Sequence, residues 1–326
     1  MDFTPCAVAC VNSMLETITT LLPVFLTIMI GAGLKQSDLI KDEHWASVEH
    51  VAYYVLFPAI VMKSIAVAEF ADVPVFRMAL AMILAILTMF AVTMLFRKPL
   101  QLALSMDGPA FTSFFQGVTR WHTFLALAIM PLVFGPQGIA LAALAAAAMI
   151  PLLNVGAVSV LSAYASGNPP SINAIGKSLL TNPFVLSSMA GIFLNATGIG
   201  LAEPIEQTFE LIGRGALAAA LLSAGAGLRF GQLRRGGIAV AAATVIKLLV
   251  MPLFMWGWTV ALGVGGLPQA VAIVSGGIPS AAAAYILARK MGGDAPLIAL
   301  ILTAQVLAAA VTLPLLITLA RQISGI

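Results

Sequence analysis

Charged residues are scarce in this chain. They make up 9% of its 326 residues, whereas about 25% is usual in a soluble domain. Hydrophobic residues account for 61%, and the mean hydropathy is +1.05. The composition therefore predicts a polytopic membrane protein. Its net charge of +3 is small, and nothing in it indicates nucleic-acid binding.

Groups that carry chemistry are also rare. The two cysteines, Cys6 and Cys10, are four residues apart, but such a pair alone is weak evidence for a metal site, and free thiols near a membrane surface are the simpler interpretation. No basic segment precedes the first apolar run, so we expect no cleaved signal peptide. We expect neither a metal nor a cofactor.

Catalytic motifs are missing as well. The sequence has no G-x-S-x-G and no H-E-x-x-H, and no Asp lies within a predicted span. A membrane-embedded enzyme is therefore disfavoured. Glu210 is the carboxylate closest to a deep position, so a sodium or proton site built on buried acids has little support.

The apolar runs predict an all-α membrane protein. Each transmembrane helix needs about 20 mostly apolar residues, and the sequence offers ten such runs. They cover residues 17–33, 48–68, 76–96, 112–134, 138–164, 175–195, 209–228, 237–260, 267–288 and 295–319.

Basic residues concentrate in alternate connections between these spans. They include Lys35 and Lys41 after the first span, Arg97 and Lys98 after the third, Lys177 at the start of the sixth, Arg229, Arg234 and Arg235 after the seventh, and Arg289 and Lys290 after the ninth. Because cytoplasmic loops carry the excess of Lys and Arg, we expect both termini outside. We expect the location to be the inner (plasma) membrane, crossed many times.

Ten spans divide into two halves of five, and an odd number per half inverts the second half. A shift of 160 residues places Pro23 on Pro183, and a shift of 157 places His122 on Pro279 and Thr123 on Ser280. The expected organisation is a first repeat at residues 1–165, a linker at 166–174 and a second, inverted repeat at 175–326. Inverted repeats are typical of secondary transporters.

The fourth predicted span has polar residues at its middle. Residues 111–134 are mostly apolar but contain Gln116, Arg120, Trp121 and His122. A charge at bilayer depth costs roughly 2.5–3.5 kcal/mol on insertion scales, so such a side chain faces protein, a water-filled cavity or a ligand. His122 lies about 15 Å into its span at 1.5 Å per residue.

The ninth predicted span is interrupted at a matching depth. Residues 275–280 read SGGIPS, and Pro279 lies about 18 Å into the span. Glycines and a proline favour unwinding. Two broken helices crossing at mid-depth would expose N–H ends that attract anions and carbonyl ends that attract cations. The predicted substrate-binding residues are Arg120, His122, Thr123, Gly276, Gly277, Pro279 and Ser280, with Gln116, Asn154 and Gln305 as possible ion-binding or path-lining residues.

Structural interpretations compete with these roles. Arg120 could snorkel or pair, and His122 could be a neutral core residue or could couple transport to protons. Lys63 and Lys247 more readily snorkel or pair than line a path. Asn154 and Gln305 could simply form hydrogen bonds between helices.

Arg214 has Glu210 four residues earlier on the same helical face. An ion pair within the helix is the simplest account of both charges.

Four segments resemble the auxin efflux carrier family, which includes plant PIN-FORMED proteins and bacterial malonate-transporter-like members. TRWHTFLALAIMPLVFG is similar to that family's span-four motif, and IPSAAAAYILARKMGGDAPL to its span-nine motif. YYVLFPAIVMKSIA and LLSAGAGL resemble its spans two and seven. Two departures are His122, where the family motif has Asn, and Ala218, where it has Pro.

The resemblance implies ten spans in two inverted repeats, with broken helices four and nine crossing as in sodium–bile acid symporters. It also implies a mobile unit of spans three to five and eight to ten, with a scaffold of the other spans that pairs two copies into a homodimer. We therefore expect an elevator-like secondary active transporter, a symporter with H⁺ or Na⁺ as coupling ion. Its substrate would be a small organic carboxylate such as malonate or an auxin-like acid. A channel or a non-transporting membrane sensor is the alternative.

Overall fold

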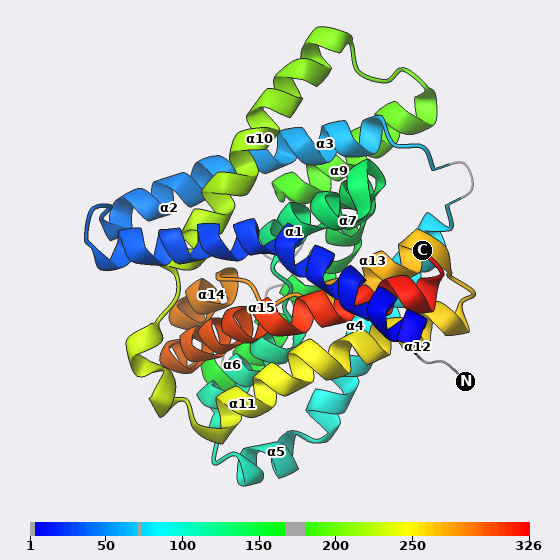
Figure 1. The fold of residues 1–326 in the computed structure, drawn as a ribbon. Helices are drawn as coiled ribbons and strands as arrows, with labels where there is room; N and C mark the ends of the chain where they lie inside the picture. The colour runs from blue at the N-terminus through cyan, green and yellow to red at the C-terminus, as the bar shows by residue number, and fades with distance from the viewer. Residues whose placement is uncertain (1–3, 71–72, 167–179) are drawn as a thin grey trace.

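The computed structural model describes residues 4–70, 73–166 and 180–326, and these residues form helices without any strand (Figure 1). The linker predicted at 166–174 lies almost wholly outside the described residues. Lys177 and the start of the sixth predicted span lie outside them as well. Helices suit a membrane interior because each satisfies its own backbone hydrogen bonds.

The first part of the chain forms helices interrupted by short irregular turns. Its elements are α1 (Thr4–Gln36), α2 (Asp42–Val51), the π-helix η1 (Ala52–Leu56), α3 (Phe57–Ala66), α4 (Val75–Leu95), α5 (Arg97–Ala103), α6 (Gly108–Thr119), α7 (Thr123–Leu161) and the π-helix η2 (Ser162–Ser166). Pro58 follows η1 at the start of α3. A proline lacks the N–H that an α-helical turn needs, so a local π turn at this point has a physical cause.

The second part of the chain also consists of α-helices interrupted by short π- and 3₁₀-helices. Its elements are α9 (Pro183–Thr197), α10 (Glu203–Ala226), the 3₁₀-helix η3 (Phe230–Arg235), α11 (Gly237–Val245), the π-helix η4 (Ile246–Val250), α12 (Met251–Ala261), α13 (Gly266–Gly276), α14 (Ala283–Met291) and α15 (Ala295–Ser324). Side-chain caps begin several of these helices: Asn182 accepts from Phe184 N at 2.9 Å, and Asp294 accepts from Leu297 N at 2.9 Å. Pro252 follows η4 as Pro58 follows η1.

Seven segments of the described residues are long and apolar enough to cross a membrane. They are Met14–Gln36, Glu43–Ala66, Val75–Leu95, Gly108–Ala165, Glu203–Ala226, Gly237–Ala261 and Ala295–Ser324. The multi-pass membrane prediction is confirmed at this level. The count of ten and the inverted repeat stay predictions, because the sixth and ninth predicted spans correspond to the shorter helices α9, α13 and α14.

The segment Gly108–Ala165 contains the fourth and fifth predicted spans. Gly135 divides it with a backbone φ of 68° and ψ of −162°, which is outside the helical region. Only glycine adopts such an angle at little cost, and Pro136 follows directly. The residue pair therefore redirects the chain where the sequence predicts one span to end and the next to begin.

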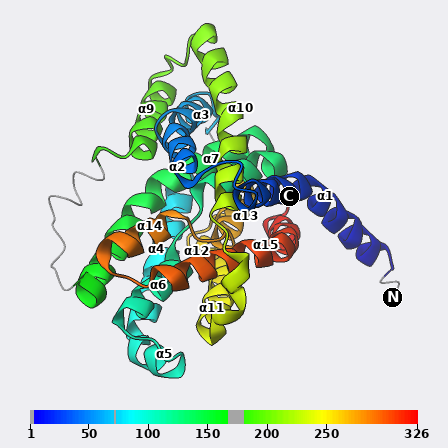
Figure 2. The same ribbon diagram turned by 90° about the vertical axis from the view of Figure 1, so that its left-hand side faces the viewer.

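The helices pack in two groups. In one group α1 lies along α10, and α3 packs on α9. In the other, α4 packs on α12, and α13 packs on both α12 and α15 (Figures 1 and 2). Helix α7 contacts members of both groups, including α3, α4 and α13. The helices α1, α3, α9 and α10 of the first group correspond to spans one, two, six and seven of the sequence prediction.

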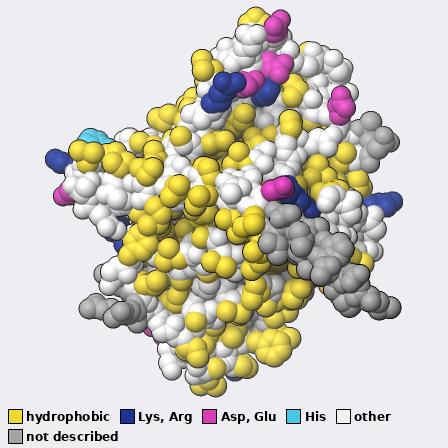
Figure 3. All heavy atoms as spheres, in the orientation of Figure 1, with side chains coloured by type: hydrophobic (Ala, Val, Ile, Leu, Met, Phe, Trp, Pro, Cys, Tyr) yellow, Lys and Arg dark blue, Asp and Glu magenta, His cyan; other side chains and the backbone are white. Residues whose placement is uncertain are grey.

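Hydrophobic side chains dominate the face drawn in Figure 3, and charged side chains gather mainly at its upper tip, over α10. Large apolar side chains are exposed on α1, α9 and α12; Leu26, Phe193 and Leu253 are examples. A soluble monomer rarely exposes so much continuous apolar surface. The exposed faces are those that a bilayer would cover.

Close backbone contact holds α1 against α10. A Cβ built on Gly225 would overlap the carbonyl of Ile28, and one built on Gly31 would overlap the carbonyl of Leu222. Small residues permit this approach, which is the usual way that helices pack in membranes.

We expect Gly225→Ala to lower the free energy of unfolding by at least about 1–3 kcal/mol, because the new methyl group overpacks a rigid backbone contact. Gly215→Ala is the matched control on the same helix, since a Cβ there meets nothing within 4 Å. Thermal unfolding of the detergent-purified proteins measures the difference. Equal melting temperatures for the two variants would contradict this packing.

Candidate functional site

The polar residues of the fourth predicted span lie where its helix breaks. Helix α6 ends at Thr119, and Arg120 has an extended backbone, with φ −67° and ψ 159°. His122 then caps α7: its Nδ1 accepts a hydrogen bond from Leu125 N at 3.3 Å. An accepting Nδ1 carries no proton, so His122 is neutral in this arrangement.

A second break, in the ninth predicted span, meets the first. Helix α13 ends at Gly276, and α14 begins at Ala283. Between them, the carbonyl of Pro279 accepts a hydrogen bond from His122 N at 2.9 Å. Ser280 Oγ donates to the carbonyl of Gly117 at 2.6 Å. The two interrupted helices therefore satisfy each other's backbone groups where they touch.

Gln305 of α15 joins the two breaks from a third helix. Its Oε1 accepts from Ser280 N at 2.9 Å, and its Nε2 donates to Gly117 O at 2.8 Å and to Ala243 O at 3.3 Å. The side chain is completely buried. The oxygen and the NH₂ group of its amide both form hydrogen bonds, as expected for a buried amide. These bonds fix the two breaks relative to each other.

A cavity of about 530 Å³ opens beside the junction. It lies between the two helix groups, because α2, η1, α9 and α10 supply one side and the broken helices the other. The lining residues are Ala46, Glu49, His50, Tyr53, Tyr54, Arg120, Trp121, His122, Thr123, Phe124, Ile150, Leu153, Asn154, Asn182, Phe184, Ala220, Ser223, Ala224, Ala281, Ala282, Ala283, Ile286 and Lys290.

Arg120 places a positive charge in the cavity wall. The residue is 7% exposed, and its Nη2 donates to Asn154 Oδ1 at 3.2 Å. Its Nε has no hydrogen-bond partner, and no carboxylate of the described residues pairs with it. A buried guanidinium normally pairs with an anion. Arg120 thus retains donors and charge for a ligand.

Two helix N-termini face the same cavity. Thr123 and Phe124 begin α7, and Ala283 begins α14; all three line the cavity. No side chain caps α14. The first N–H groups of a helix carry a partial positive charge and bind anions readily. The part of the cavity formed by Arg120 and these helix ends therefore favours a negatively charged group, whereas Glu49 places a carboxylate elsewhere in the lining.

Aromatic side chains form the rest of the wall. Phe124 stacks on Phe57 with a centroid distance of 4.3 Å and an interplanar angle of 1°. Phe184 contacts both rings, and Tyr53 contacts Phe184. Beside the charged floor, the cavity thus offers an apolar surface of the kind that receives the carbon skeleton of a ligand.

The predicted site residues separate into two sets. Arg120, His122, Thr123 and Asn154 line the cavity. Gly276, Gly277, Pro279, Ser280, Gln116 and Gln305 are buried in the junction behind it. Contact of either set with a substrate stays a prediction.

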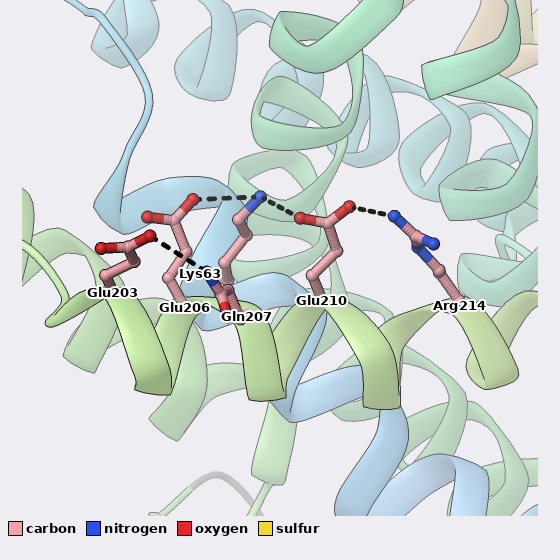
Figure 4. Close-up of polar contacts among 6 residues, drawn as sticks. All are labelled: Lys63, Glu203, Glu206, Gln207, Glu210 and Arg214. Carbon is pink, nitrogen blue, oxygen red and sulfur yellow. Dashed lines mark hydrogen bonds and ion pairs between the residues drawn. The ribbon is translucent and has the colours of Figure 1, made fainter.

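Ion pairs account for other charges in the spans. Arg214 donates to Glu210 at 2.7 Å, four residues away, which confirms the ion pair expected from their spacing. Lys63 reaches from α3 to Glu206 and Glu210 of α10, at 3.4 and 3.5 Å (Figure 4). Lys63 therefore forms ion pairs, as expected from the interpretation that it snorkels or pairs rather than lines a transport path.

Sequence reasoning missed part of the site. The aromatic residues Tyr53 and Phe184 were not expected in it, although the run YYVLFP around Tyr53 is an unusual aromatic cluster next to a proline. Lys247 was expected to pair or snorkel. Instead its Nζ donates to the carbonyl of Gly276, at the end of α13, at 3.0 Å.

One family model matches part of the chain. Residues 169–317 match the model of a family described as membrane transport protein. The match contains the motifs resembling spans seven and nine, but not the span-four motif around Arg120. The matched family consists of transporters and not of enzymes. No curated protein matches the chain.

Gln305→Leu tests the junction. It removes the partner of Ser280 N and one of the two donors to Gly117 O, and a buried unsatisfied group costs about 1–3 kcal/mol. We therefore expect a lower melting temperature and increased proteolysis near residues 117–123. Gln207→Leu, on the exposed face of α10, is the control and should leave both unchanged. Identical behaviour of the two variants would show that Gln305 does not hold the breaks together.

Proposed function

We propose that this protein is a secondary active transporter that moves a small organic carboxylate anion, such as malonate or an auxin-like acid, by an elevator-like alternating-access mechanism. The observation that carries the proposal is the guanidinium of Arg120, which lines a cavity between two helix groups without a carboxylate partner. The family match at residues 169–317 supports membrane transport in general; the substrate and the mechanism are our inference.

The proposed binding mode follows from the charges of the cavity. A carboxylate would accept hydrogen bonds from Arg120 and would lie near the positive N-terminal ends of α7 and α14. Arg suits this role because its planar donors match a carboxylate in a bidentate way. The apolar part of the anion would lie against Phe124, Phe184 and Tyr53.

Two cavities near opposite ends of the same helices support alternating access. The second, of about 420 Å³, is lined by Lys63 and Glu210 and by residues around the kink of α7. Phe124 of the first cavity's wall stacks on Phe57, which lies one turn before Ile60 of the second cavity's lining. We infer that this stack is the barrier between the two cavities. A barrier between two vestibules fits a carrier better than the alternative of an open channel or a non-transporting sensor.

The remaining sequence predictions belong to the same proposal. With both termini outside and the protein in the inner (plasma) membrane, the cavity beside Arg120 opens toward the cytoplasm. The group of α1, α3, α9 and α10 would be the scaffold and would pair two copies into a homodimer, while the other helices move. The coupling ion would be H⁺, which His122 could carry, or Na⁺.

Arg120→Met tests the binding site. Loss of a charge-assisted hydrogen bond costs about 1.5–3 kcal/mol, so we expect apparent affinity to fall about 10- to 100-fold. The measurement is uptake of labelled malonate and indole acetate into proteoliposomes. Arg77→Met, an exposed position at the start of α4, is the control. Unchanged uptake by Arg120→Met would refute the site assignment.

His122→Asn tests whether this residue carries coupling protons. Asn is a good helix N-cap, so α7 should start normally and the melting temperature should change little. Loss of the titratable imidazole should weaken the dependence of uptake on an imposed proton gradient. Uptake that follows the proton gradient equally well in both proteins would exclude His122 as the proton carrier.

Counterflow separates the carrier from a channel. A carrier should show saturable uptake that unlabelled substrate on the opposite side accelerates, whereas a channel gives single-channel currents. Currents without counterflow would overturn the alternating-access mechanism.

A further inference from the structure

Lys247 is a buried basic residue that has no carboxylate partner among the described residues. It lies on η4, is 1% exposed, and directs its Nζ to the carbonyl of Gly276 at 3.0 Å. The ion pairs of the described residues join Lys63 and Arg214 to glutamates of α10, and join His44 to Glu43; none includes Lys247. A buried ammonium group needs compensation, and here the partner of Nζ is the carbonyl oxygen of Gly276.

The carbonyl that Lys247 binds is free because helix α13 breaks. In a continuous helix Gly276 O would accept from Ser280 N, four residues later. Ser280 N instead donates to Gln305. The last carbonyls of a helix carry a partial negative charge, and freed carbonyls at the broken helices of transporters are sites that attract cations. The ammonium group therefore lies where a cation is favoured.

The neighbouring backbone adds to this environment. A Cβ on Gly276 would lie 2.8 Å from Pro252 Cα, so α13 approaches η4 and α12 closely. Pro252 has no N–H, which frees the carbonyl of Leu248 from its α-helical partner. A Cβ on Gly277 would lie 3.7 Å from that oxygen. The carbonyl of Leu248 thus lies close to the end of α13, whose Gly276 carbonyl accepts the hydrogen bond from Lys247.

We propose that the ammonium group of Lys247 is a tethered cation that occupies the carbonyl end of the broken helix α13, so that this carrier needs no sodium ion there. The chain itself supplies the charge that a bound metal cation would otherwise bring. Only the statement that transport needs no sodium ion rests on the proposed function. The occupancy of the carbonyl end by the ammonium is a property of the folded protein and can be tested without transport.

Thermal unfolding of the full chain in detergent is the first test. Melting temperatures are compared in sodium chloride, ammonium chloride and choline chloride of equal ionic strength. We expect the wild-type protein to be insensitive to the cation. Lys247→Ala should melt at least about 5 °C lower in choline and regain a substantial part of that loss in sodium or ammonium, because either small cation fits the vacated space and choline does not.

Two further variants make the result specific. Lys247→Met keeps the apolar stem, blocks the space and removes the charge, so it should melt lower than wild type with every cation. Lys98→Ala removes an exposed lysine of α5 and should match wild type throughout.

Three outcomes would overturn the proposal. Stabilisation of the wild-type protein by sodium over choline would show that the side chain of Lys247 does not replace a bound cation. A Lys247→Met protein as stable as wild type would show that the charge is dispensable. A Lys247→Ala protein no more responsive to cations than wild type would reduce Lys247 to a packing role.

Uptake of labelled malonate and indole acetate gives the second test. In proteoliposomes of the wild-type protein, replacing sodium by choline on both sides should leave the rate unchanged. A sodium requirement would overturn the proposal. If neither anion is transported at all, the proposed function fails for these substrates, while the unfolding experiment still decides the role of Lys247.

Discussion

Two helices break inside an apolar protein, and the backbone groups that these breaks free must find partners there. Water is excluded from a hydrocarbon interior, so each unsatisfied N–H or C=O costs several kcal/mol. The breaks satisfy each other: His122 N binds Pro279 O, and Ser280 Oγ binds Gly117 O. Gln305 adds three more bonds from α15. The positions of α6, α7, α13, α14 and α15 all depend on this exchange.

The direction of the helices gives the junction two electrostatic sides. The N-terminal ends of α7 and α14 reach the cavity, where Arg120 adds a full positive charge. The C-terminal end of α13 points away from it, toward the ammonium group of Lys247. An anion on the first side and a cation on the second both follow from the partial charges at helix ends. The proposed anion site and the proposed role of Lys247 therefore belong to one arrangement of helix ends.

The sequence predicted both breaks because local chemistry marks them. Arg120 and His122 are costly within an apolar run, and two glycines with Pro279 favour unwinding. It also predicted the Arg214–Glu210 pair, which needs only helical spacing. It did not predict the contact of Lys247 with Gly276 or the aromatic wall. Those contacts join helices far apart in the chain, and periodicity within one helix carries no information on which helices meet.

Composition alone determined that this protein lies in a membrane, because its charge is too scarce and its apolar runs too long for a soluble fold. The sequence also determined which residues are polar at depth. Only the tertiary structure decided what each of them does. Arg120 lines a cavity, the side chain of Gln305 forms hydrogen bonds only with backbone groups, and Lys247 donates to a backbone carbonyl at the end of α13. The reason is physical: a buried polar group takes its role from the partners within hydrogen-bond distance, and packing alone assigns those partners.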